Sequence, residues 1–205
     1  LNFAAGCSRD VIEKGAEWVA KILRNINAKE FVLEHFMSFG EGKSHEDQYY
    51  VPYSEYFKFV MTVREILRDG TYDDMYIRAY PSDDYFIKEL EKGRPTRYFR
   101  SACAEHNFVI EPDGRVSYCP IASANEMTYF GNILTDSMDS IIYNEKRINL
   151  IAKQKYFYCD CEYFHECNGG CYLIREKNIK NGEYKKVLDM LNKQQFTISQ
   201  HKKVA

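Results

Sequence analysis

Cysteine spacing constrains this chain more than any other feature of its sequence. Six of its seven cysteines lie between positions 103 and 171. The six are Cys103, Cys119, Cys159, Cys161, Cys167 and Cys171. Short spacings let a loop bring several thiolates to one centre, and Gly169 and Gly170 permit the tight backbone turns that such a loop needs. Thiolates are soft ligands that select zinc or iron–sulfur clusters over hard cations. We therefore expect these six cysteines to form a metal centre.

Disulfides and unliganded cysteines are the alternatives to a metal centre. No signal-peptide pattern opens the sequence, so we expect a cytoplasmic protein, where metal ligation is favoured over disulfides. No apolar stretch is long enough to span a bilayer, and we expect no membrane partner. The 28 Lys and Arg residues nearly balance the 30 Asp and Glu residues, so the charge gives no case for nucleic-acid binding. Zinc remains open as the metal, because local spacing alone does not separate it from iron–sulfur.

The first part of the chain alternates helix and strand signals, which predicts an α/β fold with parallel strands. The expected elements are a helix from Ser8 to about Asn25, a largely buried strand over 30–37, a polar loop over 40–48, a helix from Ser54 to near Gly70, a strand over 75–80 and a short helix over 83–92. Two such units are too few to close a barrel. Residues 1–95 are therefore expected to form the last units of a larger α/β domain, whose open edge needs further strands or a partner.

The pattern changes after Pro95. Residues 107–111 and 115–118 are β-prone and flank Pro112-Asp113-Gly114, which predicts a hairpin that brings Cys103 and Cys119 to one end. A Gly131-Asn132-Ile133 turn should lead to a helix over about 137–153, and a last helix is expected over about 184–193. Residues 96–205 are thus predicted to form a second, cysteine-rich domain.

The cysteine region resembles the SPASM domain, which lies at the C-terminal end of many radical S-adenosylmethionine (radical SAM) enzymes. Cys103 is followed by ten residues, Gly114, four residues and Cys119, and later by Cys161-x5-Cys167-x3-Cys171 with Cys159 ahead of it. The phrases 109–114 and 131–133 are also similar to that family. Residues 1–95 more loosely resemble the last units of the radical SAM partial barrel.

The resemblance implies ligand roles for the cysteines. Cys103, Cys119 and Cys171 would serve one auxiliary 4Fe–4S cluster, and Cys159, Cys161 and Cys167 a second. The family pattern has Cys-x2-Cys where this chain has Cys159-Asp160-Cys161, so the role of Cys159 is the least secure. Two clusters with four cysteines each need more thiolates than the seven present, so one cluster has an open iron or a different ligand, or is absent. The candidate non-cysteine ligands are His106, His165 and His201, and Cys7 is expected to be a core cysteine.

The radical SAM signature Cys-x3-Cys-x2-Cys does not occur in these 205 residues. The resemblance therefore implies the auxiliary-cluster portion of an enzyme that modifies a peptide or protein. Such a portion binds S-adenosylmethionine only with the missing N-terminal half, supplied in cis or in trans. A non-enzymatic peptide- or protein-binding module, stabilised by zinc or iron–sulfur, is the alternative. No residue is assigned a catalytic role.

Two further patterns have ordinary interpretations. His35 lies in an apolar strand beside Glu34 and is expected to be a hydrogen-bonded core or edge histidine. Gly40-Glu-Gly-Lys-Ser44 lacks the first glycine of a phosphate-binding loop, because Met37 occupies that position, and it is expected to be a flexible loop.

Overall fold

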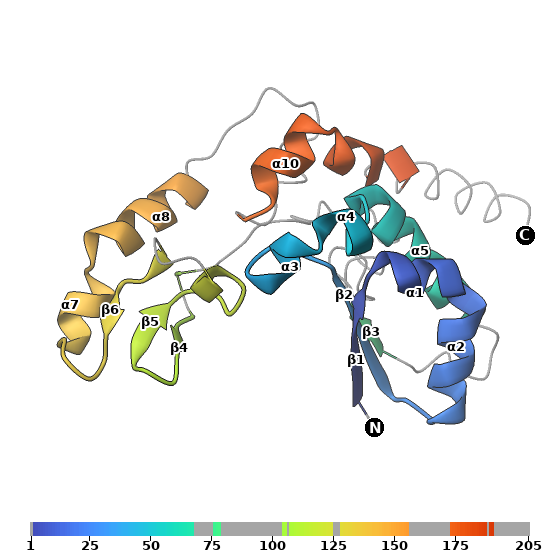
Figure 1. The fold of residues 1–205 in the computed structure, drawn as a ribbon, viewed down its shortest axis with the longest axis horizontal. Helices are drawn as coiled ribbons and strands as arrows, with labels where there is room; N and C mark the ends of the chain where they lie inside the picture. The colour runs from blue at the N-terminus through green and yellow to red at the C-terminus, as the bar shows by residue number, and fades with distance from the viewer. Residues whose placement is uncertain are drawn as a thin grey trace, which may run out of the picture.

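The structure of the chain is a computed structural model. It describes residues 2–67, 76–78, 104–105, 107–124, 128–155, 173–187 and 189–190. In Figure 1 the antiparallel sheet lies on the left and the parallel sheet right of centre, with α3 (Glu41–Ser44) between them and α10 (Arg175–Lys180) above α3. None of the helices in these segments is long and apolar enough to cross a membrane.

The first sheet is parallel and has the strand order β1-β2-β3. Its strands are β1 (Asn2–Cys7), β2 (Glu30–His35) and β3 (Tyr76–Arg78). Strand β2 pairs with β1 from Glu30↔Asn2 to His35↔Cys7, so His35 and Cys7 lie side by side where both strands end. The α/β class with parallel strands is therefore confirmed. Strand β1 was not expected, because alanine and glycine have low strand propensity, and pairing with β2 outweighs that preference.

Strand β2 is buried on one face only. Phe31, Leu33 and His35 point into the core, whereas Glu34 is exposed. The expected strand over 30–37 is thus present, but it is shorter and is not buried on both faces. The buried face packs against α5 (Tyr53–Leu67), where the Tyr56 hydroxyl donates a 2.6 Å hydrogen bond to the Leu33 carbonyl.

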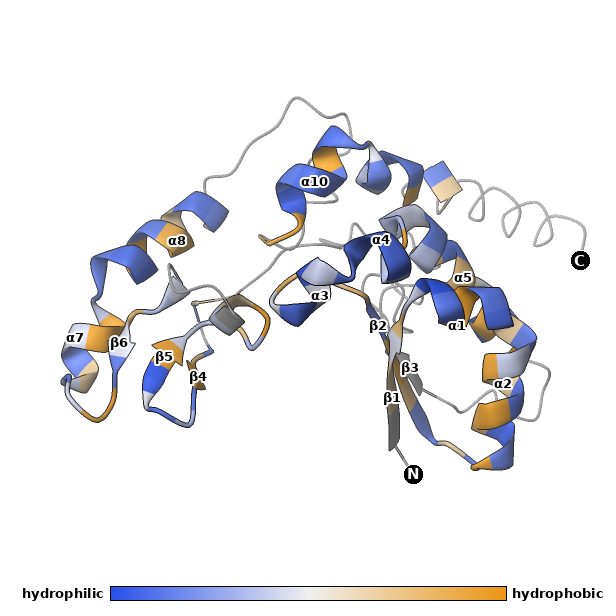
Figure 2. Cartoon of the chain, viewed as in Figure 1, coloured by the Kyte–Doolittle hydropathy of each residue, from blue (hydrophilic) through white to orange (hydrophobic). Residues whose placement is uncertain are grey.

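The helix expected from Ser8 to Asn25 is two helices. They are α1 (Arg9–Lys14) and α2 (Ala16–Asn25). Gly15 between them has φ +89° and ψ 157°, a conformation that residues with a Cβ rarely adopt. Ser8 is at the N-cap as expected, although its side chain makes no capping hydrogen bond. Figure 2 shows α2 with both hydrophobic and hydrophilic residues, and its buried residues are Val19, Ala20 and Leu23.

The region expected to be a polar loop contains two short helices. They are α3 (Glu41–Ser44) and α4 (Glu46–Tyr49). The prediction of a flexible loop at Gly40–Ser44 was therefore wrong. Backbone amides in this segment donate to carbonyls a few residues earlier, as from Lys43 to Gly40. The Ser44 hydroxyl also donates to the Glu41 carbonyl over 2.7 Å. These helices follow β2, the middle strand of the sheet.

The second sheet is antiparallel and has the order β4-β5-β6. Strands β4 (Val109–Ile110) and β5 (Arg115–Ser117) form the expected hairpin, and β6 (Gly131–Asn132) joins β5 where a turn was expected. Gly114 in the hairpin has φ +82°, and a Cβ there would lie 2.4 Å from Asn132 Oδ1. A glycine is therefore required for β6 to lie this close to the hairpin.

The helix expected over 137–153 is also interrupted. It is divided into α7 (Met138–Ile142) and α8 (Glu145–Lys155). The Ser137 hydroxyl caps α7 by accepting from the Ser140 amide, as its N-cap position predicts. Tyr143 is the C-cap of α7, and Asn144 directly precedes α8. The Asn144 Oδ1 accepts from the Lys146 amide over 2.9 Å, and its Nδ2 donates to the Phe130 carbonyl over 2.7 Å.

The C-terminal part returns to the first sheet. Helix α10 (Arg175–Lys180) was not expected, and residues 183–187 and 189–190 are helical close to where the last helix was predicted. Tyr184 and Val187 are buried in the same core as β2 and α5. Glu183 is 4% exposed and accepts from the Ser54 amide over 2.8 Å, so this segment is joined to the start of α5 by a buried hydrogen bond. The strand expected over 75–80 is present as β3, and the helix expected over 83–92 lies outside the described residues.

Candidate metal centre and adjoining pocket

Cys119 is the one of the six predicted ligands that lies within the described residues. It follows β5, is partly buried and is not in a disulfide. The other five, Cys103, Cys159, Cys161, Cys167 and Cys171, lie outside those residues, as do His106, His165 and His201. Within the described segments, no three metal-ligating side chains come together.

The sequence neighbours of two other cysteines lie in the same apolar cluster as Cys119. Ala104, which follows Cys103, is fully buried there, and Leu173, two residues after Cys171, packs against it. Ala104 has φ +66°, a left-handed conformation that is uncommon for a residue with a Cβ. The cluster is built around Tyr118 and Phe130, whose rings stack with centroids 6.1 Å apart. Its other buried residues are Val116, Ala122, Ile141 and Leu150.

Cys7 has the environment of a core residue, as expected. It is fully buried, and burial together with the nearby charge of Glu55 raises the pKa of its thiol to about 12. A thiol with so high a pKa stays protonated at neutral pH and is a poor metal ligand.

His35 also lies in the core, and it is hydrogen-bonded as predicted. It is 8% exposed, and its Nε2 lies 2.7 Å from the Val51 carbonyl oxygen. Its ring makes an edge contact with Tyr53, with centroids 5.2 Å apart, and a tilted contact with Tyr56, with centroids 5.0 Å apart. Burial lowers the pKa of His35 below its ordinary value of 6.5, more than the bond to Val51 raises it.

A pocket of about 120 Å³ opens beyond the end of β2. It lies between the segment that follows β2, helix α4 and the start of α10. Its lining residues are His35, Phe36, Met37, Ser38, Phe39, Glu46, Tyr50, Leu173, Ile174, Lys177 and Asn178. Leu173 belongs both to this pocket and to the apolar cluster around Cys119, so the pocket adjoins the cysteine region.

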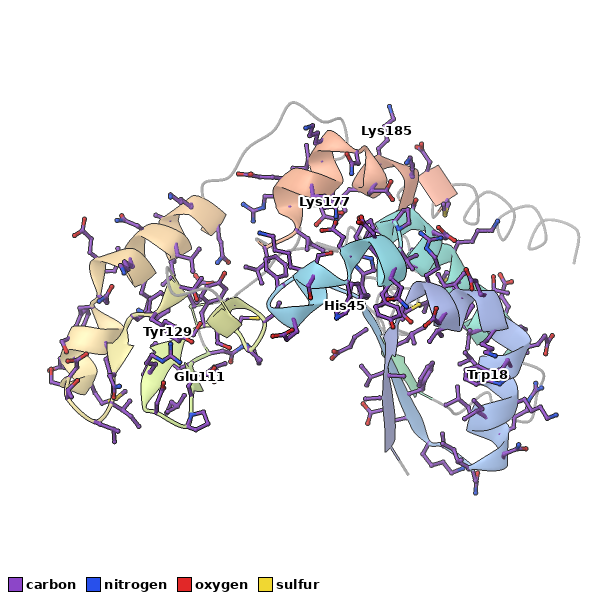
Figure 3. All side chains as sticks on the ribbon, viewed as in Figure 1. Trp18, His45, Glu111, Tyr129, Lys177 and Lys185 are labelled. Carbon is purple, nitrogen blue, oxygen red and sulfur yellow. The ribbon has the colours of Figure 1, made fainter. Side chains whose placement is uncertain are left out.

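Lys177 joins α10 to α4 at the rim of the pocket (Figure 3). Its ammonium forms an ion pair with Glu46 and lies 3.6 Å from the centroid of the Tyr50 ring. Burial and the charges of Glu183 and Glu46 raise the pKa of the Tyr50 hydroxyl. Sequence reasoning did not find Ser38, Lys177 or Asn178. The helical spacing of Ile174 and Asn178 was the available signal, but only tertiary packing places them beside β2.

The cysteine region matches a known protein family. Residues 103–172 match the family model of SPASM, described as an iron–sulfur cluster-binding domain. This part of the chain is therefore similar to SPASM domains. The match spans all six predicted ligands. No curated protein sequence is significantly similar to the chain.

Solved structures share the fold of the whole chain. Native anSMEcpe with bound AdoMet matches with a TM-score of 0.68 and 17% sequence identity, over 97% of this chain and 56% of that one. Native anSMEcpe with bound AdoMet and Kp18Cys peptide matches with a TM-score of 0.65 and 18% identity, over 98% of this chain and 57% of that one. The chain therefore shares its fold with part of these structures and spans little more than half of their length.

Proposed function

We propose that the chain is the auxiliary-cluster portion of a radical SAM enzyme that modifies a peptide or protein. Residues 1–95 supply the last units of the partial barrel, and residues 96–205 hold one or two 4Fe–4S clusters. The proposed ligands are Cys103, Cys119, Cys159, Cys161, Cys167 and Cys171. The observation that carries the proposal is the SPASM match, because it includes every one of these cysteines.

The described residues fit an iron–sulfur site at Cys119. A cluster needs thiolates that converge from separate loops and a largely apolar surrounding that limits solvent access. Cys119 is partly buried beside Tyr118 and Phe130, and Ala104 and Leu173 lie in the same apolar group. This arrangement supports Cys103, Cys119 and Cys171 as ligands of one cluster.

A bound auxiliary cluster supplies electron transfer or an iron site that holds a substrate group. The protein residues supply the surroundings, since hydrogen bonds to sulfur and burial set the reduction potential. A peptide partner is supported by the anSMEcpe structure with bound AdoMet and peptide, whose fold this chain shares. In this proposal, S-adenosylmethionine binds with the N-terminal half that carries Cys-x3-Cys-x2-Cys, joined in cis or in trans.

The ligand assignment is tested by metal content after anaerobic reconstitution. Cys119→Ala and Cys171→Ala each remove a ligand, so we expect both to lower iron and acid-labile sulfide and to increase proteolysis of the SPASM domain, since metal binding there contributes to folding. Cys7→Ala is the matched control, because its protonated thiol lies in the other core. It should keep the iron content of the unmodified chain. Equal iron loss in Cys7→Ala and Cys119→Ala would overturn the assignment.

A further inference from the structure

Arg147 on α8 connects three segments of the cysteine-rich region through one guanidinium group. Its Nη1 donates a 2.7 Å hydrogen bond to the Ile142 carbonyl at the end of α7, and its Nη2 donates over 3.2 Å to the Glu105 carbonyl. The guanidinium carbon lies 5.1 Å from the centroid of the Phe108 ring, within the range of a cation–π contact. Glu105 is 42 residues away in the sequence, so the bond to its carbonyl is a tertiary contact and not a feature of the helix.

The turn that Arg147 contacts directly follows Cys103, which itself lies outside the described residues. Ala104 is fully buried and has φ +66°. This left-handed conformation costs a residue with a Cβ free energy, and it persists only where the surrounding structure imposes it. Burial of Ala104 and the bond from Arg147 to the next carbonyl both act on this turn. Tertiary contacts therefore set the course of the backbone just after Cys103.

Arg147 also lies on the face of α8 that packs toward Cys119. Leu150 and Ile151 follow it by three and four residues, which places the three side chains on one face of the helix. Leu150 and Ile151 belong to the same apolar cluster as Ala104 and Cys119. The guanidinium group is therefore at the edge of the apolar cluster that contains one proposed ligand and the sequence neighbour of another.

We propose that Arg147 is a positioning residue for the proposed cluster ligand Cys103. By bridging the Ile142 and Glu105 carbonyls, the guanidinium group fixes the turn after Cys103 against α7, so that the ligand loop is ordered before the metal binds. Residues that orient metal ligands in this way contribute strongly to metal affinity. The inference rests on the proposed function, because it concerns how one ligand of the proposed cluster is held.

A role limited to the junction between α7 and α8 explains only part of this geometry. The last carbonyls of a helix have no partner within the helix, so a bond to Ile142 alone would account for a capping residue. The second bond reaches the turn after Cys103 instead. A planar guanidinium presents its donors in a fixed fork, whereas the ammonium of a lysine is a compact charge. The two roles therefore predict different results for Arg147→Lys, which keeps the charge and loses the fork.

The test measures how fast the anaerobically reconstituted chain loses iron to an excess of chelator. Arg147→Met keeps an apolar stem but removes both donors, so we expect iron release about tenfold faster than from the unmodified chain. Arg147→Lys should release iron at an intermediate rate, and it decides the question if Arg147→Met takes up no iron. Release from Arg147→Lys at the unmodified rate would show that charge alone suffices and would overturn the bridging role.

Two controls separate positioning from charge and from general stability. Lys146→Met removes a positive charge at the exposed neighbouring position of α8. Ser137→Ala removes the hydroxyl that caps α7, which should lower the Tm without altering a contact to the turn after Cys103. Both controls should release iron at the unmodified rate. If iron release followed the Tm alone, so that Ser137→Ala and Arg147→Met behaved alike at an equal fall in Tm, the proposal would be wrong.

A double variant shows whether Arg147 acts through the turn at Ala104. Glycine adopts positive φ angles without strain, so Ala104→Gly should make the turn depend less on Arg147. In the Ala104→Gly background we expect Arg147→Met to speed iron release only about threefold, because contacting groups are coupled. Fully independent effects of the two changes would contradict action through this turn.

The iron and sulfide content of the unmodified chain separates this proposal from the proposed function. An unmodified chain without iron after reconstitution would contradict the proposed function and, with it, the role of Arg147. An unmodified chain that contains iron, and whose rate of iron release is the same in Arg147→Met and Arg147→Lys, would contradict the role of Arg147 alone. The expected result is a chain that contains iron and loses it faster in both variants.

Discussion

At the scale of single residues, His35 links the core to the pocket. Its Nε2 is hydrogen-bonded to the Val51 carbonyl, and its ring contacts Tyr53. Its Nδ1 is buried and has no hydrogen-bond partner. Its sequence context predicted the hydrogen-bonded core position. The same context gave no sign of the pocket, because Asn178 reaches it from a helix far away in the sequence.

The lowered pKa of His35 predicts a pH dependence of stability. Burial is the main cause, opposed by the bond to Val51, with the charge of Lys177 also lowering the pKa and that of Glu183 raising it. The unfolded chain then binds a proton more readily than the folded chain. Stability is therefore fully present above the unfolded value of 6.5 and is lost as pH falls below it, by at most about 1.4 kcal/mol per pH unit.

The measurement is urea unfolding between pH 5.5 and pH 8 for the unmodified chain and His35→Gln. Glutamine does not titrate and can still donate to Val51, so the other titrating groups cancel in the difference. The difference in the free energy of unfolding between the unmodified chain and His35→Gln should decrease as the pH falls. A difference independent of pH would show that His35 is not held neutral by burial.

At the scale of elements, alternating strand and helix signals predicted β2, β3, α5 and the β4–β5 hairpin. Local patterns did not predict a break in a helix where the spacing of apolar residues continues through the break. The spacing of Val11, Ile12, Ala16 and Val19 continues through Gly15, so only the backbone of Gly15 shows the break between α1 and α2. Strand β1 has only Phe3 as a strand-forming residue and depends on its neighbour in the sheet. Five of the six candidate ligands lie outside the described residues, and their assignment still rests on spacing and the SPASM match.

The break at Gly15 predicts that alanine lowers the free energy of unfolding more at Gly15 than at Gly6. A Cβ at Gly15 meets no atom within 4 Å, so any cost of Gly15→Ala comes from its φ of +89° rather than from a clash. We expect this change to lower the free energy of unfolding by about 1–3 kcal/mol. Gly6→Ala on β1 also meets open space but has no positive φ, so its effect should stay within about 0.5 kcal/mol.

Urea unfolding followed by far-UV circular dichroism measures both variants. A neutral or stabilising Gly15→Ala would mean that α1 and α2 join into one straight helix at little cost. The Gly6→Ala control separates this backbone effect from any general effect of adding a methyl group.

At the scale of the whole molecule, the chain joins a parallel sheet to the region that matches the SPASM model and returns to the first core through Tyr184 and Val187. Figure 1 shows α10 on this return path, and its start lines the pocket. The domain boundary at 95/96 stays a prediction. The SPASM-like region and the parallel sheet are thus connected both by the chain before Cys103 and by the packing after Cys171.

This organisation predicts that the 205 residues do not cleave S-adenosylmethionine on their own. Reductive cleavage in the family needs a cluster held by Cys-x3-Cys-x2-Cys, and no three cysteines here have that spacing. We expect no 5′-deoxyadenosine from the reconstituted chain with dithionite and S-adenosylmethionine, measured by liquid chromatography. Catalytic amounts would show that an auxiliary cluster performs the cleavage.

The identity of the metal tests the central claim most directly. The chain is reconstituted anaerobically with iron, sulfide and zinc all present, and iron, acid-labile sulfide and zinc are measured per folded chain. The account predicts brown protein that contains iron and sulfide in equal amounts, with a broad absorption shoulder near ~400 nm. Colourless protein that contains zinc without sulfide would contradict it, because the same cysteines would then form thiolate zinc sites.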